Sequence, residues 1–421
     1  MIHLNYMQRS IKKSSFKPVR IFRTTLLLLF IIFLSIVSSS QRNTSATAVK
    51  TYTVSTTSAP YQDKYKKSSF YNSFTKQYFM LRSYLEQLEK LGGGVLYLKA
   101  GTYTITNSLY VPSNVTIKFA DKVVIKKGTK TGSTLLKPTS SIFQLVAPSK
   151  YKINGTYSAY DGEQNIHFVA LGKATIDLSY SKDCIGILMG HNKNVSITGI
   201  TFQNMYSGHF IEMDASYQVT VDSCTFQNHK DSLNNNKEAI NLDTPDRTTE
   251  GFHNDWSSYD CTPNKEVTIK NCNFSNLERA IGTHKYSANQ YHTNINVLNN
   301  TITSCDQDAI RVMNWSSPII TNNSIDTVAE GKGIYRCILI SGVTNPTITN
   351  NTFKNAARAI QIMPWRNSGP GSQYDTIYNS LSPTNISDMQ KNIINNVGES
   401  FIRYNKTYLV YDKDTEKIYF N

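Results

Sequence analysis

Ionisable residues occupy the same positions of a short segment that recurs along the 421-residue sequence. The segments are HFIEMD (209–214), EAINLD (238–243), RAIGTH (279–284) and DAIRVM (308–313). Their outward positions, which alternate with the inward apolar ones, include Glu212, Asp214, Asn241, Asp243, His284 and Arg311. Neighbouring strands would place these side chains in one stripe, with about 4.8 Å between coils. Carboxylates, an imidazole and a guanidinium in one stripe favour acid–base chemistry or cation binding.

Aromatic residues follow the stripe in a register of their own. Tyr286, Trp315 and Trp365 each lie two residues after the end of one of the recurring segments. Flat rings beside polar groups are typical of ligand sites, so we predict that Trp315 and Trp365 bind a sugar substrate. Rings that only cover the apolar base of a loop would show the same spacing.

Two insertions leave the chain directly after stripe residues. Residues 244–265 include Trp256, and residues 284–294 include Lys285 and His292. Long loops on a rigid scaffold are common carriers of function. We therefore predict that both insertions wall a cleft over the stripe, with Trp256, His292 and the stripe residue Asn241 binding substrate.

A second repeat sets the fold. Its units are NVSITGITFQN (194–204), QVTVDSCTFQN (218–228), EVTIKNCNFSN (266–276), NINVLNNTITS (294–304), SPIITNNSIDT (317–327) and NPTITNNTFKN (345–355). The Phe or Ile anchors recur every 23–28 residues, with one step of 48 that contains an insertion. Short strands at this period predict an all-β fold, a parallel β-helix whose coils bury one another. The turns predict a ladder of stacked amides from Asn271, Asn299, Asn322 and Asn350.

Other elements flank the repeat. Residues 73–90 carry apolar side chains at helical spacing, at Phe74, Tyr78, Leu81, Leu85 and Leu88. Such a helix would cover the open strand edge of the first coil. The predicted boundaries are 1–48 for a leader, 49–91 for an N-terminal segment with the capping helix, 92–363 for the β-helix, and 364–421 for a tail with a terminal hairpin.

The first 48 residues resemble a secretory signal peptide. They contain seven Lys and Arg residues and no acidic one, then the apolar run LLLLFIIFLSIV (26–37) and small residues. A basic start, a short apolar stretch and small residues are the marks of a cleaved signal. The run is shorter than the roughly 20 residues that span a bilayer. We therefore predict a protein that is secreted or held at the cell surface, with no stable membrane insertion after cleavage.

Six cysteines follow the leader, with no CxxC pair and no zinc-type spacing. A structural zinc site is therefore not expected. Disulfides are permitted outside the cell, and buried free thiols fit the same positions equally well.

The entry segment GGGVLYLKAGTYTI (92–105), followed by SNVTIKF (113–119) and the repeats, resembles the pectin-lyase-like superfamily over residues 70–363. This resemblance implies a single-stranded right-handed parallel β-helix with an N-terminal capping helix. The superfamily includes polysaccharide lyases, pectin hydrolases, epimerases, esterases and phage tailspikes, so the fold leaves the chemistry open.

A lyase acting on an anionic, uronic-acid-containing polysaccharide fits the stripe best. β-Elimination needs a neutralised carboxylate, a base for the C5 proton and an acid for the leaving oxygen. We predict His284 as base with Lys285 as its alternate, Arg311 as carboxylate clamp, and Tyr286 or His292 as acid. Asp243 either orients His284 or joins Glu212 and Asp214 in binding Ca²⁺, the one cofactor that we consider. A surface Asp243–Arg311 ion pair and a turn-bound His284 are the structural alternatives.

Two other functions stay open. A glycoside hydrolase needs two carboxylates about 5–10 Å apart, which Glu212, Asp214 and Asp243 can supply. Resemblance to pectin hydrolases implies NTD, DD, GHG and RIK elements, yet residues 242–244 read LDT and 282–284 read GTH. The DPHD-like motif of epimerases and the RxPxxR element of calcium-dependent pectate lyases are absent too. The third function is a non-catalytic surface β-helix that binds polysaccharide.

The net charge of +14 is modest for this length, and no nucleic-acid-binding motif occurs. We therefore expect an anionic polysaccharide as partner, no nucleic acid, and a monomer.

Overall fold

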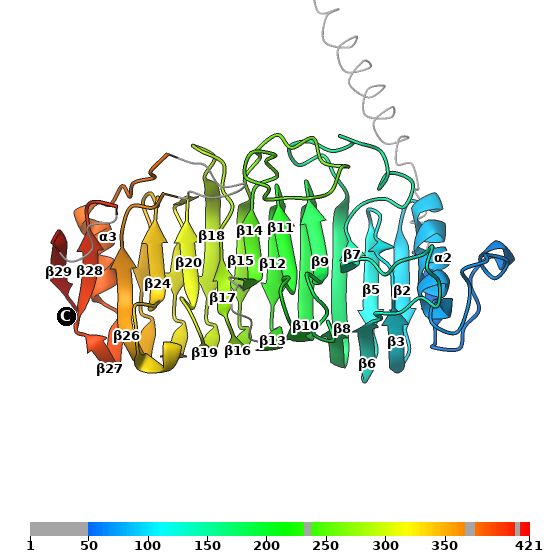
Figure 1. The fold of residues 1–421 in the computed structure, drawn as a ribbon, viewed down its shortest axis with the longest axis horizontal. Helices are drawn as coiled ribbons and strands as arrows, with labels where there is room; N and C mark the ends of the chain where they lie inside the picture. The colour runs from blue at the N-terminus through cyan, green and yellow to red at the C-terminus, as the bar shows by residue number, and fades with distance from the viewer. Residues whose placement is uncertain (1–48, 231–236, 367–374, 409–412) are drawn as a thin grey trace, which may run out of the picture. The chain divides into compact units, whose positions relative to one another are not determined.

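The computed structural model describes residues 49–230, 237–366, 375–408 and 413–421, so the predicted leader lies outside the described residues. From residue 49 onward, short parallel strands build a stack of coils, and successive coils add neighbouring strands to three faces (Figure 1). None of the helices in the described ranges has the length and apolar character needed to cross a bilayer. The predicted fold, an all-β right-handed parallel β-helix with an N-terminal helix, is confirmed.

Each coil runs through face 1, face 2 and face 3 in that order. Face 1 comprises β1 (Thr51–Val54), β2 (Gly94–Leu98), β5 (Val115–Phe119), the first parts of β8 (Gln164–Asp177) and β10 (Lys193–Met205), β12 (Tyr217–Asp222), β15 (Lys265–Lys270), β18 (His292–Leu298), β21 (Trp315–Ser316), β22 (Ile319–Thr321) and β25 (Thr347–Thr349). Face 2 comprises β3 (Gly101–Ile105), β6 (Val123–Lys127), the second parts of β8 and β10, β13 (Thr225–His229), β16 (Asn273–Leu277), β19 (Thr301–Cys305), β23 (Ser324–Val328), the first part of β26 (Thr352–Ile362) and β27 (Ile393–Glu399).

Face 3 carries the recurring charged segments. It comprises β4 (Leu109–Tyr110), β7 (Ser141–Gln144), β9 (Ile185–Gly190), β11 (Ile211–Asp214), β14 (Glu238–Asp243), β17 (Arg279–Gly282), β20 (Ile310–Met313), β24 (Arg336–Ser341), the second part of β26, β28 (Phe401–Asn405) and β29 (Thr415–Tyr419). The helices are η1 (Asp63–Tyr65), α2 (Lys76–Lys90), η2 (Ala329–Gly331) and α3 (Pro383–Gln390).

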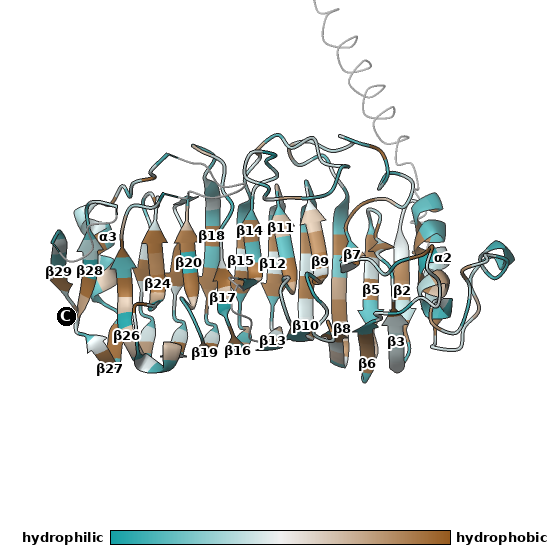
Figure 2. Ribbon diagram, viewed as in Figure 1, coloured by the Kyte–Doolittle hydropathy of each residue, from teal (hydrophilic) through white to brown (hydrophobic). Residues whose placement is uncertain are grey.

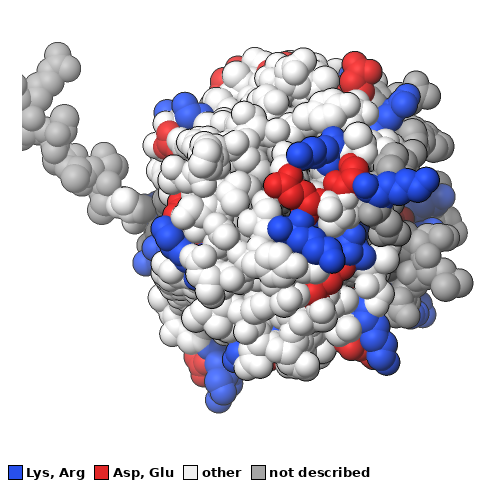
Figure 3. Space-filling model, turned by 90° about the vertical axis from the view of Figure 1, so that its left-hand side faces the viewer, with Lys and Arg blue, Asp and Glu red and all other residues white. Residues whose placement is uncertain are grey.

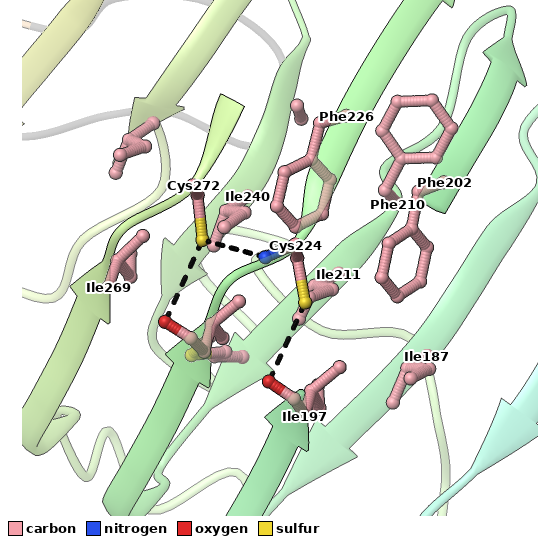
Figure 4. Close-up of a cluster of buried hydrophobic side chains, with 14 of the residues drawn as sticks. Ile187, Ile197, Phe202, Phe210, Ile211, Cys224, Phe226, Ile240, Ile269 and Cys272 are labelled. Atoms are coloured by element: carbon pink, nitrogen blue, oxygen red, sulfur yellow. Dashed lines mark hydrogen bonds between the residues drawn. The ribbon is translucent and has the colours of Figure 1, made fainter. Parts of the chain in front are cut away.

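The inside of the stack is a column of apolar side chains, which gives the strands of Figure 2 their alternating hydrophobic and hydrophilic bands. The predicted anchors are in register from coil to coil: Phe202, Phe226, Phe274, Ile302, Ile325 and Phe353. The Phe226 ring stacks between those of Phe202 and Phe274, at 5.0 and 4.8 Å between centroids, and Figure 4 shows Phe202 and Phe226 side by side. Stacked rings add about 0.5–1.5 kcal/mol per pair to the burial itself.

An amide ladder exists, but the sequence analysis placed it one residue too early. Asn271, Asn299, Asn322 and Asn350 adopt positive φ angles of 54–58° and form the corner of the turn. The next residue of each later turn points inward and builds the ladder: Asn300, Asn323, Asn351 and Asn392. The left-handed corner turns the first asparagine away from the core, which is why the second one stacks.

The six cysteines are free thiols, and five of them are buried. Cys224 and Cys272 occupy the ladder position of the preceding coils, where the Cys224 N–H donates to the Cys272 Sγ atom at 3.4 Å (Figure 4). These thiols therefore fill the column as small buried side chains.

The N-terminal end is capped as predicted, with α2 packed on β2, β3 and β4. The helix begins at Lys76, so Phe74 precedes it and stays 48% exposed. β1 pairs in parallel with β2, so the strands begin before the predicted start of the β-helix at residue 92.

The C-terminal end extends beyond the predicted limit at residue 363, because β27 and β28 both pair in parallel with β26. The chain closes with an antiparallel pair of β28 and β29, which lies within the predicted tail at 364–421. Figure 3 faces this end and shows Lys and Arg beside Asp and Glu. Ion pairs there include Arg358 and Arg403 with Glu399, and charged ends discourage edge-to-edge pairing.

Candidate functional site

The predicted stripe is confirmed as an alignment on face 3. The register brings four residues into one row: Glu212, Asn241, Gly282 and Arg311. In the next row, Asp214 aligns with Asp243. The surprise is burial: each of these side chains other than Gly282 is at most 6% exposed. Among the described residues, the insertions bury these side chains and leave part of the face accessible as a cavity.

That part is a cavity of about 520 Å³ above β11 and β14. The ionisable residues that line it include His209, Glu212, Lys237, Asp243, His284 and Lys285. The insertion that follows β14 adds a wall with Glu250 and His253. Three predicted catalytic residues, Asp243, His284 and Lys285, therefore share one cavity, and so do the predicted Asn241 and Glu212.

His284 is fixed at the point where the chain leaves β17. The backbone N–H groups of His284 and Lys285 both donate to Asp243 Oδ1, at 3.0 and 2.9 Å. The imidazole Nδ1 lies 3.2 Å from Glu238 Oε2 and 3.6 Å from Asp243 Oδ2. Two carboxylates thus orient one imidazole at the wall of the cavity, an arrangement that suits a general base.

Glu238 is fully buried and ionised. Burial alone disfavours its charged form, but His284, Arg279 and Arg311 outweigh burial and hold the pKa of Glu238 well below its usual range. The guanidinium groups lie 3.7 and 3.9 Å from Oε1. Burial lowers the pKa of the neighbouring Lys285, which eases its use as a base or acid.

The carboxylates of β11 behave in the opposite way. Burial, followed by the charge of Asp243, raises the pKa of Glu212 to about 8. Burial, with Glu212 and Asp243, also raises the pKa of Asp214 well above its usual range. Like charges in a buried site favour bound protons or a bound cation.

The unpaired oxygen atoms of this group are donors of the type that binds calcium. Among the described residues, neither carboxylate oxygen of Asp214 has a hydrogen-bond partner, and the same holds for Asn241 Oδ1. All three atoms are buried, and each lost hydrogen bond at a buried group costs about 1–3 kcal/mol. Hard oxygen donors from carboxylates and amides are what Ca²⁺ prefers.

Arg311 does not line the cavity, so its predicted place as an exposed carboxylate clamp is wrong. Its Nε lies 2.9 Å from the Met313 sulfur, and its guanidinium lies 5.5 Å from the Trp365 ring. Burial lowers the pKa of Arg311 to about 10. The loop that starts at His284 covers this coil, so Arg311 acts on Glu238 rather than on a ligand.

The predicted exposed aromatic column is wrong as well. Tyr286 and Trp315 are 0% exposed, and the Trp315 indole N–H donates to Thr283 Oγ1 at 2.8 Å. Trp365 is half-buried and packs with Ile377 on the Tyr286 cluster. These rings cover the apolar base of a loop, which was the structural alternative for the same spacing.

Two further predicted binding residues are internal. Trp256 packs edge-to-face on Phe252, with 5.0 Å between ring centroids, and belongs to the buried apolar cluster that includes Leu188 of β9. His292 is 0% exposed, and its Nδ1 accepts the Asn264 N–H at 2.9 Å. Burial lowers the pKa of His292 to about 3, so it is neither a surface contact nor an acid for the cavity.

His209, Lys237 and Glu238 also belong to this site and were not predicted, although the sequence carries a signal for His209 and Glu238. The recurring segments, which continue as RCILIS (336–341) and RAIQIM (358–363), all open with an ionisable residue: His209, Glu238, Arg279, Asp308, Arg336 and Arg358. We had considered only the alternating positions further along each strand. The opening residues form a charged column of their own, and two of them meet His284.

Residues 185–410 match the family model described as right handed beta helix region. A curated relative, plasmin and fibronectin-binding protein A of Streptococcus pneumoniae (strain ATCC BAA-255 / R6), is 25% identical over 262 residues, which are 58% of this chain and 36% of the relative. The chain thus spans about a third of the length of that relative.

Two solved structures share the fold. The Streptococcus pneumoniae surface protein and adhesin PfbA superposes with a TM-score of 0.60 at 20% identity and covers 87% of both chains. A crystal structure of PfbA, a surface adhesin of the same species, gives 0.58 at 18% identity, over 85% of this chain and 81% of the other. At these identities the likeness concerns the fold.

Proposed function

The chain belongs to the right-handed β-helix family, and from this premise we propose that it is an extracellular protein that binds an anionic polysaccharide in the face 3 cavity and cleaves it by β-elimination. The observation that carries the proposal is the convergence of an oriented imidazole, His284, with two lysines, Lys237 and Lys285, in one cavity. The entry segment at 92–119 supports placement in the pectin-lyase-like superfamily, and residues 1–48 support secretion.

The proposed chemistry uses these groups in sequence. The ammonium groups of Lys237 and Lys285 neutralise the uronate carboxylate, which makes the C5 proton more acidic. His284 accepts that proton, the C4–O bond breaks, and a C4–C5 double bond forms in the new non-reducing end. The leaving oxygen takes a proton from the imidazolium or from water. The lysines therefore replace Arg311 as the carboxylate clamp.

Glu238 and Asp243 act as positioning residues in this scheme. Glu238 keeps the His284 ring in place through Nδ1, and Asp243 holds the backbone at His284 and Lys285. Arg279 and Arg311 keep Glu238 ionised. In this scheme the buried charges beneath the cavity position the His284 ring and the backbone at Lys285, while the ligand contacts only the residues that line the cavity.

We propose Ca²⁺ as a cofactor, held by Asp214, Asn241 and Glu212. When bound, the ion would supply positive charge beneath the cavity floor and so favour an anionic ligand. The orphaned oxygens of Asp214 and Asn241 support this assignment.

Binding without cleavage is the second candidate. The curated relative is named a plasmin and fibronectin-binding protein, and the solved relatives are described as surface adhesins. A surface β-helix that retains polysaccharide would use Lys237 and Lys285 in the same way but would need no base.

The test is the ultraviolet absorbance of unsaturated uronate products. Purified residues 49–421 are incubated with pectate, alginate, heparosan, hyaluronan and chondroitin, each with and without Ca²⁺. We expect absorbance to rise on one polymer, and His284→Ala to abolish the rise. His167→Ala is the matched control, because His167 lies on face 1 (β8), away from the cavity. New reducing ends without absorbance would instead favour a hydrolase that uses Glu212 and Asp243, and retention without products would favour binding alone.

A further inference from the structure

His209 is an unassigned imidazole that faces the cavity in a defined tautomer. Its Nδ1 lies 2.6 Å from the backbone carbonyl oxygen of Glu238, so Nδ1 must carry the proton and donate it. The other nitrogen, Nε2, then has a free lone pair, while the residue lines the cavity. A histidine whose second ring nitrogen donates to a backbone carbonyl is the usual form of a metal ligand.

Two further ligand groups lie beside it. Glu238 Oε2 and His284 Nδ1 are 3.2 Å apart, and one ligand atom from each of His209, Glu238 and His284 lies within 4.8 Å of the others. The rings of the two histidines are nearly parallel, at 29°, with centroids 5.8 Å apart. The three residues come from different coils, which the stack holds at a fixed spacing.

The surroundings of the carboxylate also suit a ligand. Arg279 and Arg311 lie near Oε1 and leave Oε2 turned to the histidines. Ligating carboxylates are commonly held by outer partners of this kind. The carboxylates of Glu238 and Asp243, which both lie near His284 Nδ1, offset part of the positive charge of the nearby arginines and lysines, so added positive charge at Oε2 is tolerated.

We propose that His209, Glu238 and His284 form a binding site for a divalent transition-metal ion of the zinc type. Two imidazoles and one carboxylate are a common donor set for such ions and leave a coordination position open, here toward the cavity. The donors lie about 2 Å from a bound zinc ion, so the three side chains draw closer on binding. This site differs from the all-oxygen calcium group in both donors and ion preference.

Cobalt(II) is the probe, because its visible absorbance reports nitrogen ligation directly and needs no substrate. Residues 49–421 are freed of metal with a chelator, dialysed and titrated with CoCl₂ in the presence of excess Ca²⁺. We expect one equivalent of Co²⁺ to bind with ligand-field bands that Ca²⁺ does not remove. His209→Ala and His284→Ala should each weaken binding at least tenfold.

His253→Ala is the matched control, since His253 lines the same cavity outside the cluster. His209→Gln serves if the alanine variant fails to fold, because its amide N–H can still donate to the Glu238 carbonyl. A wild-type spectrum equal to that of aqueous Co²⁺, or unchanged affinity in the His209 variants, would overturn the proposal. The readout does not depend on lyase activity, so the two proposals fail separately. Where activity exists, a metal on His284 blocks the base, and the chelator should increase the rate.

Discussion

Two columns of buried polar side chains run along the stack, and they differ in whether their atoms are paired. In the amide ladder, Asn323 accepts from the N–H and amide of Asn300 and donates to Asn351 and to Val297 O. On face 3, both oxygens of Asp214 and Asn241 Oδ1 lack partners among the described residues. Both columns are buried to a similar degree.

The difference in pairing indicates that the amide ladder stabilises the fold and that the face 3 column serves ligand binding. A paired buried amide stabilises the turns and fixes the register between coils. An unpaired buried carboxylate costs stability and persists only where a ligand, a proton or an ion completes it. The buried oxygen atoms of face 3 that lack partners therefore mark a candidate ligand position, which lies beneath the cavity.

Neutralising Glu238 should lower the free energy of unfolding, whereas neutralising Asp214 should raise it in the absence of a bound ion. Of the changes considered, Glu238→Gln should have the largest effect on stability. The change leaves the guanidinium groups of Arg279 and Arg311 buried beside a neutral amide. Removing one partner of a buried ion pair destabilises by about 3–5 kcal/mol. Urea unfolding at neutral pH measures this loss, and a midpoint equal to that of the wild type would show that Glu238 does not balance the arginines.

Asn323→Ala should come next, with a loss of about 3 kcal/mol, because the N–H and amide of Asn300 lose their acceptor inside the core. The same urea titration measures it. Asn322→Gly is the matched control from the neighbouring turn corner, outside the ladder, because glycine adopts the positive φ of that corner without strain. If the two variants unfold alike, the ladder is not the stabilising column.

The effect of Ca²⁺ on stability should distinguish the Asp214 site from the amide ladder. At a hundredfold excess over its dissociation constant, an ion that binds only the folded state adds about 2.7 kcal/mol. We expect this gain in the wild type and in Asn323→Ala, and its loss in Asp214→Asn. Unfolding midpoints with Ca²⁺ and with a chelator measure it. An equal gain in all three proteins would place the ion elsewhere.

The smallest expected effect on stability concerns Lys127, whose buried ammonium group has hydrogen-bond partners. Its ammonium donates to the carbonyl oxygens of Thr106 and Ser141, at 2.9 and 3.4 Å, while burial lowers its pKa to about 8. The unfolded chain, with the ordinary higher pKa, binds more protons above pH 8, so stability rises as the pH rises through that value. Between pH 7 and 9 we expect a gain of about 1 kcal/mol.

Thermal melts of the wild type and Lys127→Met across that range test the effect. Only the difference between the two proteins counts, because other groups titrate in both. A difference that stays constant or falls with pH would contradict the assignment.

The sequence was sufficient for the fold and for the alignment of the stripe, because both follow from local periodicity. The period of the anchors places Phe202 on Phe226 and Glu212 beside Asn241 without further information. The same argument correctly put His284, Lys285 and Asp243 together, since all three lie at or directly after strand ends.

The periodicity of the sequence cannot predict which outward side chains are exposed to solvent. Which outward side chains reach solvent depends on where the insertions fold, and these loops buried Arg311, Tyr286 and Trp315. The ladder shift had a local cause, since the left-handed φ at Asn322 decides that Asn323 points inward. His209 and Glu238 were missed because they open their segments, ahead of the alternating positions that we compared.

The most direct test of the account measures activity and stability on the same samples of His284→Ala and Asn323→Ala. The account predicts a reciprocal pattern, at a temperature where all proteins are folded. His284→Ala should lose unsaturated-uronate release by about 10²–10⁴-fold with a smaller loss of stability than Asn323→Ala, because Arg279 and Arg311 still balance Glu238, whereas Asn323→Ala should keep the rate. Equal rates in His284→Ala and the wild type, or parallel losses of both quantities in both variants, would contradict it.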